Sequence, residues 1–123
     1  MQIYEDLRGT EKVYSPFVEW RGNPYVSPTI NIDADGLRIH RLGFEPNAAR
    51  TIGFFGGSAM WGTGVADDDT IPAQFDGMTT GWRVANYAEI AWTSRQSVEQ
   101  LINLLHADAT PDIVVFYDGA NDV

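Results

Sequence analysis

The sequence predicts an α/β fold built on a parallel sheet, and the spacing of apolar runs after residue 50 is the main reason. Three short runs have the length and the aromatic or β-branched content of buried strands: 50–55 (RTIGFF), 82–88 (WRVANYA) and 112–118 (DIVVFYD). Helix-length segments separate them. The order strand, helix, strand, helix, strand predicts right-handed crossovers, and therefore a parallel sheet with helices on its faces.

Both intervening helices carry start signals. The first is expected over 70–78, with Thr70 as its N-cap, Pro72 in its first turn and an apolar face formed by Ile71, Phe75 and Met78. The second is expected over 94–106, where Thr93 and Gln96 have the spacing of a capping box. Its apolar stripe comprises Val98, Leu101, Ile102 and Leu105.

Residues 1–49 differ from this pattern and predict an extended, β-rich N-terminal arm. Alternating apolar residues flank turn-forming residues at 33–36, which is typical of a β-hairpin. The aromatic residues Trp20 and Tyr25 have two interpretations, since they can line a ligand groove or attach the arm to a neighbouring core. We therefore divide the chain into an arm, 1–49, and an α/β part, 50–123.

Composition limits the possible functions. The chain has 123 residues, 44% of them hydrophobic, which is enough for the core of one small domain. Its net charge of −9 argues against nucleic acid or an anionic membrane as a partner. The absence of cysteine excludes disulfides, thiolate metal sites and a cysteine nucleophile. We find neither a signal-peptide pattern nor a membrane span, and leave cytoplasm and bacterial cell envelope open as locations.

Chemistry is expected where the parallel strands end, because ligands of such sheets bind beyond the carboxyl ends of the strands. Glycine-rich or polar loops follow all three strands, with the sequences GGSAMWGTG, NYAEIAWTS and DGANDV. Ser58, Ala91 and Asn121 lie in these loops. We expect them to converge at one edge of a sheet in which the first strand lies between the second and the third.

The same loops resemble the conserved blocks of the SGNH, or GDSL, hydrolases. Gly56, Gly57 and Ser58, with Gly62 and Gly64 beyond, resemble the first block, Gly-Asp-Ser, with glycine in place of aspartate. Residues 86–94 resemble the second block, and Gly119 to Asp122 match the third block, Gly-x-Asn-Asp. The arm segment PTINIDADGLR is similar to the region before the first block in a subgroup of bacterial SGNH proteins.

This resemblance implies a three-layer, flavodoxin-like α/β/α fold and hydrolysis of a carboxylic ester, with a small-molecule, lipid or carbohydrate ester as substrate. Ser58 would be the nucleophile. The oxyanion hole would comprise the Ser58 N–H, the Ala91 N–H and the Asn121 side-chain amide. Ala91 stands where the family has glycine, so its backbone conformation matters if φ must be positive. No cofactor or metal is implied.

The general base is missing. SGNH hydrolases take histidine and aspartate from an Asp-x-x-His block after the third strand, and the chain stops at Val123. His106 is expected at the opposite edge of the sheet, whereas His40 is in the arm, which would have to fold over the site. We therefore expect a hydrolase domain truncated after its third core strand, which leaves a sheet edge free for self-association.

Other interpretations remain. Asp122 is either the triad acid or a support for its loop, and Asp67, Asp68 and Asp69 are either a cation site or a solvated helix cap. The GGSAMWGTG loop lacks the Gly-Lys-Ser/Thr ending of a phosphate-binding loop. The alternative function is a non-catalytic flavodoxin-like or carbohydrate-binding module.

Overall fold

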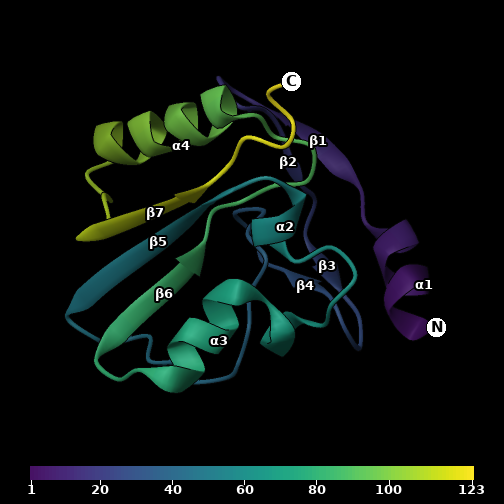
Figure 1. Ribbon diagram of the computed structural model, residues 1–123, viewed down its shortest axis with the longest axis horizontal. Coiled ribbons are helices and arrows are strands. Elements are labelled where there is room, and N and C mark those ends of the chain that lie inside the picture. The colour runs from purple at the N-terminus through teal and green to yellow at the C-terminus, as the bar shows by residue number, and fades with distance from the viewer.

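The computed structural model describes residues 1–123 and has a mixed α/β fold with four α-helices (Figure 1). At its centre lies a parallel sheet of three strands in the order β6-β5-β7, which are Trp82–Asn86, Arg50–Gly56 and Ile113–Tyr117. The predicted order is thus confirmed. β5 is buried from Ile52 to Gly56 because both its edges are paired and helices cover the sheet.

The two long helices begin where their capping signals predict. α3 spans Ile71–Met78, and the Thr70 hydroxyl accepts a hydrogen bond from the Ala73 N–H at 3.4 Å. α4 spans Ser94–His106 and starts with the capping box of Thr93 and Gln96. The two helices lie on opposite sides of the sheet (Figure 1). The connection from β5 to β6 and the connection from β6 to β7 run in opposite directions across the sheet, and two right-handed crossovers of this kind place their helices on opposite faces. No helix combines the length and the apolar character needed to cross a membrane.

The predicted apolar face of α3 is correct for Phe75, which packs against the core, and wrong for Ile71 and Met78. Ile71 and Met78 are exposed, at 45% and 77%, and Phe75 is half-buried. The buried residues are instead Pro72, Ala73 and Asp76. Asp76 faces inward because its carboxylate binds His40 of the arm, with 2.8 Å between Oδ2 and Nε2. The contact with a distant segment therefore adds a buried polar residue to the side of the helix on which Pro72, Ala73 and Phe75 pack.

The apolar stripe of α4 is largely exposed as well. Val98, Ile102 and Leu105 are 48%, 37% and 55% exposed, and the buried residues of α4 are Gln96 and Ser97. β7 pairs only with β5, and exposed apolar side chains continue along it at Ile113, Phe116 and Tyr117. α4 and the free edge of β7 thus both carry apolar side chains that nothing in this chain covers.

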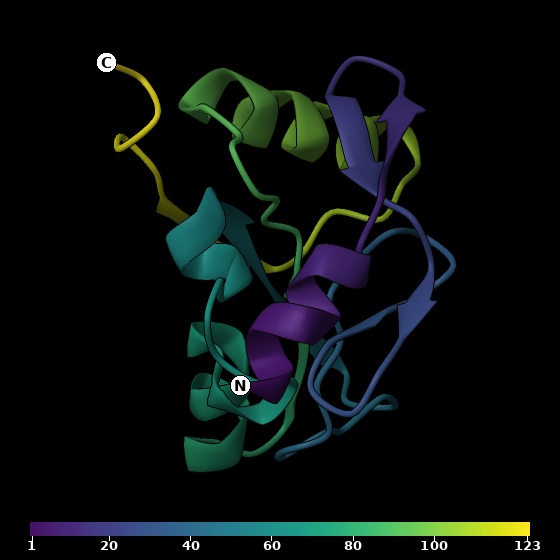
Figure 2. The ribbon, with the colours of Figure 1, turned by 90° about the vertical axis from the view of Figure 1, so that its right-hand side faces the viewer.

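The arm, residues 1–49, contains one short helix and two small antiparallel pairs. α1 is Gln2–Gly9, β1 (Lys12–Ser15) pairs with β2 (Glu19–Gly22), and β3 (Tyr25–Val26) pairs with β4 (Asn31–Ile32). The predicted turn at 33–36 is present, since the Gly36 N–H donates to the Asp33 carbonyl at 3.1 Å. Figure 2 shows the arm running beside the sheet and its helices.

The arm shares the hydrophobic core of the α/β part. Ile3, Ile30 and Ile32 of the arm belong to the same buried cluster as six residues from the sheet and its loops, which are Ile52, Phe54, Met60, Trp61, Val84 and Ala88. Tyr25 packs against this cluster. The arm is therefore bound to the sheet by apolar burial, and Tyr25 attaches it there.

Arg38 adds a polar attachment to this core. Its guanidinium lies 4.4 Å above the ring of buried Trp61 and donates to the carbonyls of Gly62 and Val65, each at 2.6 Å. It also pairs with Asp67 at 2.9 Å. Asp67 thus serves as an arm anchor, so the expectation of a merely solvated cap is wrong for this residue.

We predict that Arg38→Met destabilises the protein by about 3 kcal/mol or more, because buried carbonyls and a carboxylate lose their charged donor. The free energy of unfolding in urea measures the effect. Arg50→Met is the matched control, since Arg50 stacks on Trp82 at 4.2 Å without donating a side-chain hydrogen bond. Its cost should stay below about 1 kcal/mol. Equal losses in the two variants would contradict a special role of the buried donor.

Candidate functional site

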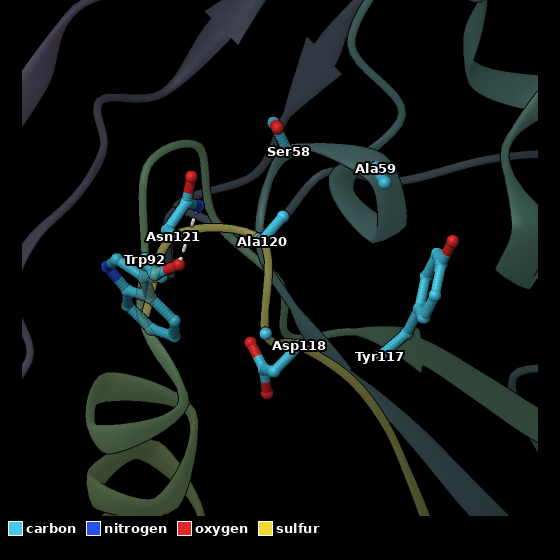
Figure 3. A pocket seen from close by; sticks show the side chains of 9 residues that line it. Ser58, Ala59, Trp92, Tyr117, Asp118, Ala120 and Asn121 are labelled. Atoms are coloured by element: carbon cyan, nitrogen blue, oxygen red, sulfur yellow. Dashed lines mark hydrogen bonds between the residues drawn. The ribbon is translucent and has the colours of Figure 1, made fainter. Parts of the chain in front are cut away.

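A cavity of about 240 Å³ opens at the carboxyl edge of the sheet (Figure 3). The loops after β5, β6 and β7 all contribute to it. Its lining consists of Gly57, Ser58, Ala59, Trp92, Tyr117, Asp118, Gly119, Ala120 and Asn121. Ser58 and Asn121, which are 63 residues apart in the chain, thus come together as the sequence predicts.

Ser58 is the first residue of α2, Ser58–Trp61, directly beyond β5. Its neighbours Met60 and Trp61 are buried and hold this short helix, whereas Ser58 is half-buried and its hydroxyl has no hydrogen-bond partner in the protein. The first N–H groups of a helix lack partners within it. Ser58 therefore combines a free hydroxyl with an N–H at a helix start.

Gly57 lets two loops approach each other. A Cβ atom at this position would lie 2.9 Å from Asn121 Nδ2 and 3.2 Å from the Trp92 carbonyl oxygen. Both distances are too short for ordinary contacts. The absence of a side chain at Gly57 thus makes room for the Asn121 amide beside the start of α2.

Asn121 is positioned by the loop after β6. Its Nδ2 donates to the Trp92 carbonyl oxygen at 2.8 Å (Figure 3), which leaves the second hydrogen of the amide free. The next residue, Asp122, accepts hydrogen bonds from the Ser94 N–H at 2.9 Å and from its hydroxyl at 2.8 Å. Asp122 thus has the contacts of a loop support, and these bonds lower its pKa.

Ala91 has the positive φ that its glycine-like position suggests, with a value of 65°. Its N–H has no hydrogen-bond acceptor in the protein. Ala91 does not itself line the cavity, although Trp92, the next residue, does. A left-handed conformation costs an L-residue about 1 kcal/mol, so the surrounding contacts must hold Ala91 in place.

Those contacts come from buried charges that our sequence analysis missed. Arg21 donates to the carbonyls of Tyr87 and Ala88, at 2.8 and 3.2 Å, and lies 4.3 Å above the Trp92 ring. Burial lowers its pKa to about 10, with Glu89 opposing this change. No local signal in the sequence distinguishes this buried charge from an exposed one, because Arg21 stands in a mixed segment between Glu19 and Asn23.

Glu89 is fully buried in the same loop. Its Oε1 accepts from the Ile90 N–H and its Oε2 from the Gly22 N–H, both at 2.8 Å, and Lys12 pairs with it. The carboxylate thus joins the β1-β2 hairpin to the residues directly before Ala91. Burial of a carboxylate is tolerated only with such partners.

Neither histidine lies at the cavity. His40 is buried against Asp76 of α3, and His106 is exposed at the end of α4. The histidine, aspartate and glutamate side chains form no group of three or more that could hold a metal ion. The cavity thus brings the Ser58 hydroxyl and the Asn121 amide together with one carboxylate, Asp118, and lacks a neighbouring imidazole.

Comparison with known protein families finds none that matches this chain, and no curated protein matches it significantly.

We predict that Ala91→Gly stabilises the protein by about 0.5 kcal/mol, because relief of the left-handed strain exceeds the added flexibility of the unfolded chain. Ala120→Gly is a matched control in an exposed loop at the same edge, and its φ is not positive. It should destabilise by about 0.5 kcal/mol. Urea denaturation compares the two, and a loss of stability in Ala91→Gly would contradict the strain.

We predict opposite effects for two neighbouring aspartates. Burial raises the pKa of Asp118, so ionisation of this residue above pH 3.8 weakens the fold. The hydrogen bonds from Ser94 lower the pKa of Asp122, so ionisation of Asp122 strengthens the fold. At pH 7, Asp118→Asn should raise the urea midpoint and Asp122→Asn should lower it. Both differences should shrink as the pH falls below 3.8. Differences that do not change with pH would contradict this assignment.

Proposed function

We propose that the chain is the N-terminal part of an SGNH-type serine hydrolase that cleaves carboxylic esters of lipids, carbohydrates or other small molecules. One observation carries the proposal: Ser58 and the Asn121 amide line one cavity at the carboxyl edge of a parallel sheet, in loops that resemble the first and third blocks. The Trp92 carbonyl, in the loop that resembles the second block, holds that amide.

The proposed reaction begins when Ser58 Oγ attacks the ester carbonyl carbon and its proton passes to a base. The tetrahedral intermediate carries its negative charge on the former carbonyl oxygen. The N–H groups of Ser58 and Ala91 and the free hydrogen of Asn121 Nδ2 are the proposed donors to this oxygen. The alcohol leaves with a proton, and water then releases the acid from the acyl-serine.

Neutral donors suit this reaction because they do not form ion pairs with ground-state groups. Loss of one such donor typically raises the barrier by about 3 kcal/mol. The Asn121 amide and the Ala91 N–H are held by contacts already present without substrate, so little reorganisation is needed when charge develops. This preorganisation favours a catalytic use of the site over simple binding.

We propose that a segment following Val123 supplies the histidine and aspartate and covers the apolar surface of α4 and β7. Two observations support this: neither histidine of the chain lines the cavity, and Val98, Ile102 and Leu105 form an exposed stripe beside the free edge of β7. A further strand paired with β7 would bury that stripe. Without it, the same surface favours self-association of the chain.

We predict that the chain extended through the coding sequence after Val123 reacts with a fluorophosphonate ester at Ser58 and hydrolyses p-nitrophenyl acetate. Ser58→Ala should abolish both activities, whereas the 123-residue chain should be almost inactive. Asn121→Ala should lower kcat about 100-fold with little change in KM, because the amide contacts the oxyanion rather than the ground state.

Asn103→Ala is the matched control on α4, away from the cavity, and should retain activity. Absence of any Ser58-dependent reaction in the extended chain would reject the esterase and favour the non-catalytic binding module. A rise in KM alone in Asn121→Ala would assign that amide to substrate binding.

A further inference from the structure

We propose that Trp20 is a positioning residue for the oxyanion hole and acts through the main-chain carbonyl of Ile90. The inference rests on the proposed function, in which the Ala91 N–H is an oxyanion donor. Trp20 belongs to the arm, outside all three blocks, and touches no reacting atom. Its effect would be to fix the direction of one peptide group.

The indole Nε1 of Trp20 donates to the Ile90 carbonyl oxygen at 3.1 Å. That carbonyl and the Ala91 N–H belong to the same peptide unit. A trans peptide is planar, and its C=O and N–H point in opposite directions. The indole holds the carbonyl toward the arm, so the Ala91 N–H must point away from the arm.

The residues before Ala91 are fixed as well, so the loop cannot adjust as a whole. Glu89 Oε1 accepts from the Ile90 N–H at 2.8 Å, and Arg21 donates to the carbonyls of Tyr87 and Ala88. The peptide between Ile90 and Ala91 is the central peptide of a turn, which the Trp92 N–H closes by donating to the Glu89 carbonyl oxygen at 3.3 Å. Its carbonyl has the Trp20 indole as its hydrogen-bond partner.

Trp20 is itself held by the loop that it positions. The Trp92 indole donates to the Trp20 carbonyl oxygen at 3.2 Å, so each of the two tryptophans donates to the segment of the other. The tip of the hairpin is anchored at Val18, which is fully buried and whose carbonyl accepts from Gln96 Nε2 at 3.1 Å. Figure 2 shows this hairpin beside α4.

The positive φ of Ala91 makes this contact important. Alanine does not favour the left-handed region, and its N–H gains no bond within the protein there. The turn fixes the residues on either side of this peptide, and the Trp20 indole fixes the direction of its carbonyl. If the indole donor is removed, the peptide is free to rotate, which changes the direction of the Ala91 N–H.

The test is Trp20→Phe, which keeps an aromatic ring and removes the N–H donor. Trp82→Phe is the matched control, because Trp82 is also half-buried, its indole makes no hydrogen bond, and it lies at the opposite end of the sheet. In the 123-residue chain, NMR should show a strong intraresidue NOE between the Ala91 amide and α protons, as positive φ requires. It should weaken in Trp20→Phe and persist in Trp82→Phe.

In the extended chain, Trp20→Phe should lower kcat for p-nitrophenyl acetate about tenfold or more with KM unchanged, and Trp82→Phe should leave both near parent values. An unchanged Ala91 NOE in folded Trp20→Phe overturns the proposal. If Trp20→Phe does not fold, the parent chain itself provides the test, because the hydrogen-bonded Trp20 indole proton should exchange with solvent more slowly than the Trp82 indole proton, which has no acceptor. Equally fast exchange of the two indole protons overturns the proposal.

The NOE measurement and the kinetic measurement together distinguish a failure of the positioning role from a failure of the proposed esterase function. If the extended parent shows no Ser58-dependent turnover, the proposed esterase fails, and the NOE comparison still decides whether Trp20 orients the Ala91 peptide. If turnover is present and kcat is the same in Trp20→Phe and Trp82→Phe, the positioning role is rejected while the esterase stands.

Discussion

Buried guanidinium groups that donate to main-chain carbonyls hold the loops of this protein in place. Arg38 stacks on Trp61 and binds the loop after Ser58, and Arg21 stacks on Trp92 and binds the loop before Ala91. A buried carbonyl left without a donor lowers the stability of the fold by more than an ordinary hydrogen bond raises it. Because both arginines come from the arm, the arm is a structural part of the cavity edge.

This arrangement explains how a chain without cysteine or a metal cluster keeps irregular loops rigid. The loop after β6 contains a buried carboxylate, a left-handed alanine and a free N–H within three residues, 89–91. Each of these is costly alone, and together they persist because the β1-β2 hairpin binds them. The cost of the left-handed Ala91 and of the buried Glu89 is thus offset by hydrogen bonds to the β1-β2 hairpin.

Local sequence signals predicted where the helices begin. They did not predict which polar residues are buried, because that depends on contacts between distant segments. Thr70, Thr93 and Gln96 act within four residues of their partners, so the caps could be predicted from spacing alone. The burial of Asp76 on α3 could not, because its partner, His40, stands 36 residues earlier in the chain. The same holds for Arg21 and Glu89, whose burial depends on a hairpin that docks across the chain.

The distribution of charge adds a final constraint on the proposed chemistry. Residues 51–123 contain ten acids and two bases, and Arg21 and Arg38 of the arm are buried. The surface around the cavity is acidic, because Asp118 lines the cavity and Asp122 lies in the same loop. In the proposed reaction, a neutral ester would meet little repulsion in such a field, whereas the released carboxylate would be repelled at short range, within the screening length of about 8 Å. Neutral donors in an acidic surface would thus stabilise the transient oxyanion of that reaction and still favour release of the acid.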